Sequence, residues 1–381
     1  MYFNAAKIII FVHITKYGYT IPNIYKLILN TIIYHSLRYY KAMKKTLFLL
    51  TMLVLTGFQS LKAQFDTQLS NYWAAISYFN PAYAGQTGNL EATLLSRVQW
   101  LGIENAPRTT LMNVQMPYSL LGKVHGFGAS MYNDRSGLFS VSMYSGQYAW
   151  KKKMLKGNFS IGIQAGYINQ SFDGTKVEIP EDDYHSTTDE AIPTTLVSGT
   201  SVDFALGLFF SKEKWFAGLS VNHLLAPTLD LTDKYVFEIP RSYYFTAGYN
   251  IQLSNPLLEL RPTLLVKTME MSSLYLDGDS LVAKVETNTL KAMLRNTQVD
   301  VSVRLVYNKQ FWGGLSWRKD DAMILMLGGT FKMIEAGYAY DFPVSRIIKE
   351  STGSHEVFIR YTTNINLNKS IKNKHKSVRL L

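Results

Sequence analysis

The stretch that decides the fold has an apolar or aromatic side chain at every second position: Phe159-Ser160-Ile161-Gly162-Ile163-Gln164-Ala165-Gly166-Tyr167. The same alternation is found in Tyr243–Ile251 and Val299–Tyr307, and it recurs from about Glu91 onward. Successive side chains on a strand point to opposite faces, so each segment has one apolar face and one polar or small-residue face. A barrel in lipid turns its apolar faces outward and lines its lumen with the polar ones. The pattern therefore predicts an all-β transmembrane antiparallel β-barrel of the outer membrane.

The alternating segments predict about fourteen strands, and bacterial outer-membrane barrels have an even number of strands. The expected ranges are 90–99, 108–116, 124–134, 138–150, 157–169, 199–211, 214–224, 241–252, 257–268, 296–308, 311–318, 322–330, 331–341 and 355–365.

The lengths of the links between these segments give an independent indication. Short links follow the even-numbered segments (151–156, 212–213, 253–256, 309–310 and almost none near 331), and longer links follow the odd-numbered ones (170–199, 225–240, 269–295 and 342–354). Links 135–137 and 319–321 depart from this rule. Outer-membrane barrels have short periplasmic turns and longer outside loops, so the sorting favours a barrel over a soluble secreted β-protein.

Aromatic residues make up 13% of the chain. Those near the predicted strand ends suggest interfacial girdles, although aromatic residues also have a general preference for strands. The candidates are Trp100, Tyr132, Tyr148, Trp150, Trp215, Trp312 and Trp317.

The N-terminal region indicates export. Met43-Lys44-Lys45 precedes a short apolar run that ends before Ala63, which is the pattern of a signal peptide over 43–63 cleaved after Ala63. Residues 1–42 then suggest a start codon assigned too early, and a genuine membrane-anchoring extension is the alternative.

The basic balance of the chain comes from its two ends. The formal net charge is +11, yet residues 1–63 hold eight Lys or Arg and no acid, which leaves 31 basic and 28 acidic residues, or +3, in the mature chain. Five more basic residues lie in the tail 366–381. The high isoelectric point is therefore no argument for nucleic-acid binding. Cysteine is absent, which excludes disulfides and thiolate metal sites.

No pattern for catalysis, cofactor or metal binding emerges, and we expect a non-enzymatic protein. His125 and Ser130 form no triad pattern, and Asp277-Gly278-Asp279 lacks the remaining ligands of a calcium loop. Glu181-Asp182-Asp183 is typical of a solvated acidic patch, with weak divalent-ion binding as an alternative. Glycines such as Gly126 and Gly128 are expected to make room inside the barrel. The polar side chains expected in the lumen, either in mutual ion pairs or tuning a pore, are Gln164, Glu259, Arg261, Asp300, Arg304 and Glu335.

The segment 64–89 precedes the first strand and contains a shaped motif, Asn80-Pro81-Ala82-Tyr83-Ala84-Gly85. Pro81 fixes its own backbone and biases Asn80 away from helix, and Gly85 tolerates positive φ. We expect a periplasmic or plug segment that packs into the periplasmic mouth of the barrel, with a mobile leader as the alternative.

Several motifs follow one another along the mature chain: Asn80, Pro81, Tyr83 and Gly85, then Arg97, Gln99, Trp100 and Pro107, then Asp134 and Gly137, and finally Gly353, Ser354, His355 and Glu356. In this order they resemble the PorP/SprF family of outer-membrane proteins of the Bacteroidetes type IX secretion system. The resemblance gives these residues a structural or partner-binding role.

The resemblance implies a component that assists secretion or surface attachment of a partner protein, such as a large adhesin of the gliding-motility type. Its implied partners are the type IX secretion machinery, the secreted surface protein and outer-membrane lipid. A transport barrel for small hydrophobic or polar solutes is the alternative. The expected organisation is a leader over 1–63, a plug over 64–89, a barrel over 90–365 and a basic periplasmic tail over 366–381.

Overall fold

The computed structural model describes residues 67–120, 122–177, 193–232, 235–277, 280–286, 296–344 and 346–365. The chain divides into Met1–Ala63 and Gln64–Leu381, and all described residues belong to the second unit. The expectations for the leader, the acidic patch 181–183 and the basic tail lie outside the described residues.

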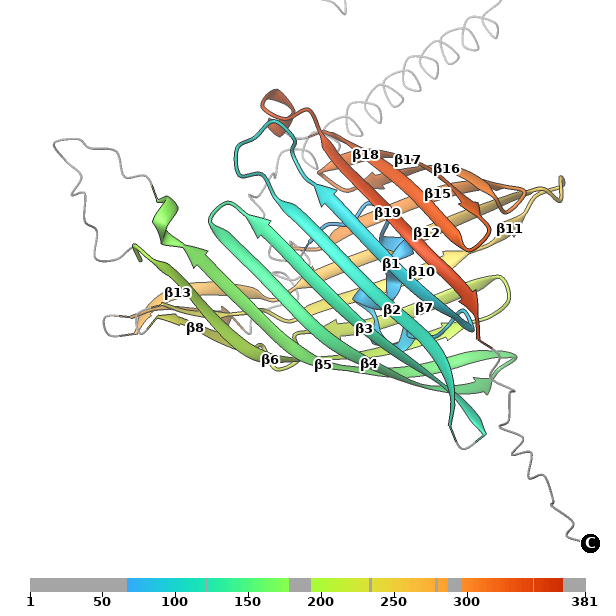
Figure 1. The fold of residues 1–381 in the computed structure, drawn as a ribbon, viewed down its shortest axis with the longest axis horizontal. Coiled ribbons are helices and arrows are strands. Elements are labelled where there is room, and N and C mark those ends of the chain that lie inside the picture. Colours follow the sequence, from blue (N-terminus) through green and yellow to red (C-terminus); the bar gives the residue numbers. More distant parts are fainter. Residues whose placement is uncertain are drawn as a thin grey trace, which may run out of the picture. The chain divides into compact units, whose positions relative to one another are not determined.

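Fourteen antiparallel strands form a closed barrel, which confirms the predicted architecture (Figure 1). Neighbours in sequence pair with each other, and closure comes from pairing of the first strand with the last and of β10 with β12. The two-residue strand β11 (Ile251–Gln252) extends the hairpin between β10 and β12. The wall consists of β1 (Asn89–Val98), β2 (Arg108–Leu120), β3 (Lys123–Ser136), β4 (Phe139–Met154), β5 (Gly157–Asp173), β6 (Leu196–Ser211), β7 (Trp215–Asn222), β10 (Ser242–Tyr249), β12 (Leu258–Met269), β15 (Gln298–Tyr307), β16 (Phe311–Arg318), β17 (Ala322–Phe331), β18 (Ile334–Pro343) and β19 (Ser354–Asn364).

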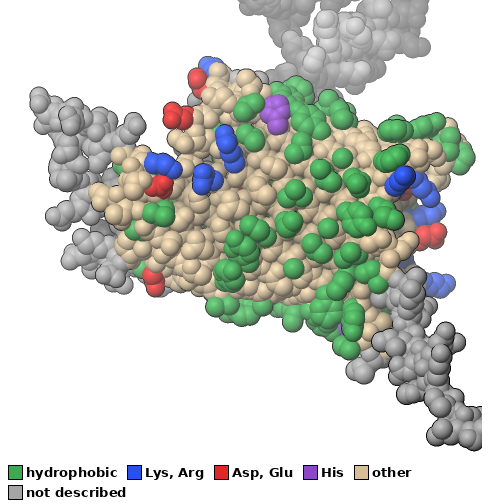
Figure 2. Space-filling model, in the orientation of Figure 1, with side chains coloured by type: hydrophobic (Ala, Val, Ile, Leu, Met, Phe, Trp, Pro, Cys, Tyr) green, Lys and Arg blue, Asp and Glu red, His purple; other side chains and the backbone are tan. Residues whose placement is uncertain are grey.

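The alternation seen in the sequence separates the two faces of this wall. On β5, Ile161 and Ile163 are 40% and 52% exposed, whereas Ser160 and Gln164, which flank this pair, are buried in the lumen. Figure 2 shows hydrophobic side chains spread over the wall, with charged side chains gathered toward its two ends. An apolar band between two charged rims is the surface that a bilayer requires.

The observed links follow the predicted sorting by length. Links after even-numbered wall strands are short, from two residues between Met154 and Gly157 to the eight residues 250–257 that include β11. Links 137–138 and 319–321 follow odd-numbered strands and are also short, as the sequence indicated. The links 174–195, 223–241 and 270–297 follow odd-numbered wall strands. Because periplasmic turns are short and outside loops long, we call the two ends of the barrel the periplasmic end and the outer end.

Two of the long outer links contain strands that the sequence did not predict. β8 (Thr228–Thr232), β9 (Tyr235–Glu238), β13 (Met271–Asp277) and β14 (Ser280–Glu286) form a separate four-stranded sheet in which β9 and β14 are parallel. Two other links contain the short 3-10 helices η3 (Gly174–Lys176) and η4 (Arg346–Lys349). None of the helices in the described ranges is long and apolar enough to cross a membrane.

Candidate functional site: a plug held in the lumen

The segment 67–88, which we call the plug, lies inside the barrel. It contains the short helices η1 (Tyr72–Ala74), α3 (Ile76–Phe79) and η2 (Pro81–Tyr83), and residues 68–82 are all buried. Figure 1 shows this segment enclosed by the strands, behind β1 and β2. Its first residues contact the outer ends of the strands, and Gly85 contacts Gln115 and Met116 toward the periplasmic end of β2. The sequence predicted that this segment packs into the periplasmic mouth. In the structure it extends from there through the lumen to the outer ends of the strands.

A buried carboxylate holds the backbone of the plug at its outer end. Glu356, fully buried on β19, accepts the backbone N–H groups of Ser70 at 2.7 Å and Asn71 at 2.6 Å. The side-chain amide of Asn71 donates to the same carboxylate at 2.9 Å. Hydrogen bonds to a charged acceptor are about twice as strong as neutral ones, so Glu356 fixes the position of this turn.

Two buried arginines complete the outer network. Arg97 of β1 donates to Ser70 Oγ at 2.7 Å and to Asp341 at 2.8 Å, and its distance to Glu356 is 3.6 Å. Arg318 of β16 pairs with Asp300 at 2.7 Å and with Asp341 at 3.0 Å. Arg318 also donates to the backbone oxygen of Leu69 at 3.2 Å. The network thus joins five wall strands, β1, β15, β16, β18 and β19, to one turn of the plug.

Aromatic rings pack the next layer toward the periplasm. The edge of Trp73 meets Trp312 at 5.0 Å and Phe358 at 5.4 Å between ring centroids. The guanidinium of Arg304 lies 3.4 Å from the centroid of the Trp73 ring, a cation–π contact. Of the residues expected in the interfacial girdles, Trp312 and Tyr132 face the lumen instead, 6% and 7% exposed. That assignment was wrong because the plug supplies apolar partners inside the barrel.

The Asn80–Gly85 motif closes the periplasmic part of the plug. Asn80 caps η2 by accepting the N–H of Ala82 at 2.9 Å, and its amide donates to the backbone oxygens of Leu208 at 2.9 Å and Leu219 at 3.2 Å. Ser220 Oγ donates to the backbone oxygen of Phe79 at 2.7 Å. The motif is therefore bonded to adjacent wall strands β6 and β7.

Glycines on the lumen face make room for this motif, as expected from the sequence. A Cβ added to Gly162 would overlap the backbone of Pro81 and Ala82, and one on Gly126 would overlap the backbone of Ala84. A Cβ on Gly207 would overlap the side chain of Asn80. The backbone of the wall and the backbone of the plug are thus packed too closely at these positions to leave room for a side chain.

We expect Gly162→Ala to impair plug seating, because its methyl group would displace backbone rather than a flexible side chain. Overpacking of this kind lowers the free energy of unfolding by about 1–3 kcal/mol. Gly146→Ala is the matched control, since an added Cβ there meets nothing within 4 Å. Heat-modifiable migration in detergent measures the folded fraction, and equal behaviour of the two variants would refute the tight fit. Substitution of Pro81 and Tyr83 should also impair assembly, because it removes contacts that seat the motif, such as that of the Tyr83 ring with Phe209.

The remaining motif residues gather at the outer ends of β19, β1, β2 and β3. They bond to one another and to near neighbours at this rim. The backbone N–H of Trp100 donates to Ser354 Oγ at 3.1 Å, and the N–H of Leu101 donates to the Gly353 oxygen at 2.8 Å. The N–H of Gln99 donates to the Pro107 oxygen at 2.9 Å, and the N–H of Gly137 donates to the Asn105 oxygen at 3.0 Å. Thr109 donates to Asp134 at 2.5 Å, and His355 bonds Tyr338 at 2.7 Å. Gly353 and Gly137 have φ of 106° and 61°, which glycine adopts without strain. These residues shape the rim around Arg97 and Glu356.

Sequence reasoning missed Arg318 and Asp341, which complete the outer network. Each lies at an inward position of a strand that alternates, and that alternation was the available signal. Of the polar residues expected in the lumen, only Glu259 and Arg261 pair with each other, at 2.8 Å. Glu335 pairs instead with Arg360 at 3.2 Å.

The described residues contain no group of three His, Asp or Glu side chains placed to hold a metal ion. His125 bonds the Tyr148 hydroxyl at 2.8 Å, and Ser130 bonds Ser145 at 2.6 Å. Both pairs join neighbouring strands of the wall.

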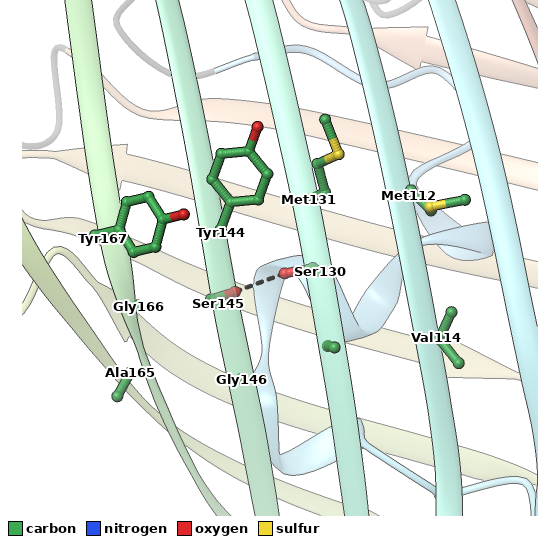
Figure 3. A pocket seen from close by; sticks show the side chains of 11 residues that line it. Met112, Val114, Ser130, Met131, Tyr144, Ser145, Gly146, Ala165, Gly166 and Tyr167 are labelled. Carbon is green, nitrogen blue, oxygen red and sulfur yellow. Dashed lines mark hydrogen bonds between the residues drawn. The ribbon is translucent and has the colours of Figure 1, made fainter.

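A hollow of about 510 Å³ lies on the wall across β2 to β5 (Figure 3). Its floor is a row of small residues that are direct register partners, Ala129, Gly146 and Ala165, and Met131, Tyr144 and Tyr167 border it. Because this row lies on the outward face of the apolar band, the hollow faces lipid and is no aqueous binding site.

A family model described as "Type IX secretion system membrane protein PorP/SprF" matches residues 61–361. No curated protein matches the chain.

Similar solved structures include the Pseudomonas putida toluene transporter TodX, at 11% identity and a TM-score of 0.40, covering 80% of this chain and 96% of that one. The Acinetobacter baumannii outer membrane protein Omp33 shows 5% identity and a TM-score of 0.38, covering 72% and 98%.

Proposed function

We propose, from the premise that this chain belongs to the PorP/SprF family of type IX secretion system membrane proteins, that it assists secretion or surface attachment of a partner protein. The partner class we favour is a large adhesin of the gliding-motility type. In this role the barrel is a non-enzymatic component of the outer membrane, and it works with proteins of the secretion machinery. Its outer links meet the secreted partner, and its short turns meet the machinery.

The observation that carries the proposal is the buried plug. At its outer end the plug is held by hydrogen bonds to the buried Glu356, within a network of buried ion pairs. At its periplasmic end it is held by hydrogen bonds from Asn80 and by close packing of its backbone against glycines of the wall. A barrel filled in this way supports a role as a rigid platform. The four-stranded sheet of β8, β9, β13 and β14 adds surface to the outer links, where a secreted partner would dock.

Deletion of the whole chain tests the proposal. We expect at least one secreted protein to be lost from the cell surface, with recovery on complementation by the full chain. Quantitative proteomics of the cell surface, the periplasm and the culture medium measures this. Trimming residues 271–286 in the complementing chain should reduce attachment and leave the barrel in the outer membrane. Unchanged surface proteins after deletion would refute the proposal.

Solute transport is the second candidate, and partly exposed charges at the periplasmic end of the lumen favour it. The side chains of Arg261 and Glu335 are 33% and 17% exposed there. Because the plug fills the middle of the lumen, we expect the intact protein to give no steady solute flux in liposome swelling. A chain lacking residues 67–84 should conduct if it still folds. Steady flux through the intact chain would favour transport over the platform role.

A further inference from the structure

The two ends of the barrel carry opposite charge. The short links and the strand residues beside them (121–124, 151–156, 212–214, 250–257, 308–310 and 332–333) contain nine lysines and one acidic residue, a net charge of +8. The described residues of the outer links (99–107, 137–138, 174–177, 193–195, 223–232, 235–241, 270–277, 280–286, 296–297, 319–321, 344 and 346–353) contain six basic and nine acidic residues, a net charge of −3. A chain whose barrel and plug are close to neutral thus concentrates positive charge at its periplasmic end.

Most of this positive charge lies on one side of the rim. Seven of the nine lysines belong to the three adjacent turns β2–β3, β4–β5 and β6–β7. Lys151 donates to the plug residue Gln86 at 3.1 Å. The other six are exposed, and no ion pair is recorded for them among the residues that the structure describes. We call them the lysine face: Lys123, Lys152, Lys153, Lys156, Lys212 and Lys214.

Backbone geometry shows that turn formation does not explain the lysine at position 156. Leu155 and Lys156 form the β4–β5 turn with φ of 51° and 56°, a conformation that glycine and asparagine adopt most easily. A larger L-residue is strained there. Leu155 is also 73% exposed at the tip of this turn. The β4–β5 turn thus presents an exposed apolar side chain beside lysines that have no ion pair among the described residues.

We propose that the lysine face docks an acidic surface of a periplasmic protein. This inference rests on the proposed function and adds the location and charge of the contact. Complementary charge speeds encounter and excludes like-charged partners. Phospholipid headgroups are the alternative occupant. The inner leaflet of the outer membrane surrounds all six turns equally, whereas seven of the nine lysines lie in or beside three of the six turns. The asymmetry therefore favours a protein.

Charge reversal in the full chain tests the proposal. We expect Lys153→Glu with Lys156→Glu to reduce the surface level of the secreted partner about tenfold or more, since like charges facing each other cost more than 1.4 kcal/mol. Lys309→Glu with Lys332→Glu is the matched control: it changes charge equally and alters two positive-φ turn positions across the barrel. We expect the control to secrete within about twofold of the unchanged chain. Equal secretion by both double variants would overturn the proposal.

Carbodiimide crosslinking in intact cells, which joins lysine amines to activated carboxylates as amides, identifies the occupant. We expect peptides from Lys152, Lys153 or Lys212 to be joined to Asp- and Glu-rich segments of one periplasmic protein. Thermal unfolding in phosphatidylglycerol and phosphatidylcholine bilayers provides the lipid arm. If the variant loses stability only in phosphatidylglycerol and crosslinks to no protein, the face binds lipid and the proposal is wrong. Normal secretion by the variant, with secretion lost on whole-chain deletion, would refute this inference and leave the proposed function standing.

Discussion

Arg318→Gln should lower the free energy of unfolding by about 3–5 kcal/mol, the range for breaking a buried ion pair from one side. The Arg318 side chain is fully buried and lies 2.7 Å from Asp300 and 3.0 Å from Asp341. Its loss leaves Asp300 without its arginine and Asp341 with only Arg97 as a cationic partner. It also removes the donor to the Leu69 oxygen, so the outer end of the plug should loosen together with the wall.

The midpoint of urea unfolding in detergent, followed by tryptophan fluorescence, measures this loss. Arg108→Gln is the matched control, because Arg108 is exposed and faces Arg135 across β2 and β3. Like charges opposite each other are unfavourable, so removal of one should leave the midpoint unchanged or slightly raised. A similar midpoint for both variants would show that the buried network contributes little to stability.

Trp73→Ala should have a comparable effect through packing rather than charge. Truncation of a buried Trp costs about 3–5 kcal/mol because a cavity remains. Here it also removes the ring against which Arg304 stacks at 3.4 Å. We expect both a lower unfolding midpoint and intermittent single-channel conductance, because the gap opens in the middle of the lumen between Trp312 and Phe358.

Trp317→Ala controls for the loss of an indole ring, since Trp317 is 46% exposed on the wall. It should unfold at a midpoint much closer to that of the unchanged chain, and its lumen should stay closed. Conductance from Trp317→Ala, or a silent and stable Trp73→Ala, would contradict the view that Trp73 seals the lumen.

Local pattern was sufficient for the wall. Each predicted strand range overlaps an observed wall strand, because in-and-out alternation is a property of neighbouring residues. The turns were found for the same reason. Pattern failed in the long outer links, where β9 pairs with β14 from a different link, since no local signal encodes a pairing between segments so far apart.

The motif residues show the same division within the candidate site. Arg97 and Glu356 stood out by resemblance alone, and the structure places both against Ser70 of the plug. Arg318 carried no signal beyond its inward position. Trp312 was assigned to the wrong surface, because aromatic residues suit a membrane interface and a packed lumen equally well.

Local patterns in the sequence are enough to specify an alternating antiparallel barrel with short turns at one end, because strand periodicity and turn length depend on neighbouring residues. The course of the segment before β1 through the middle of the lumen follows instead from contacts made in three dimensions. That arrangement depends on backbone contacts between Ala82 and Gly162 and on ion pairs between residues hundreds of positions apart. Such contacts exist only once the wall has closed around the plug.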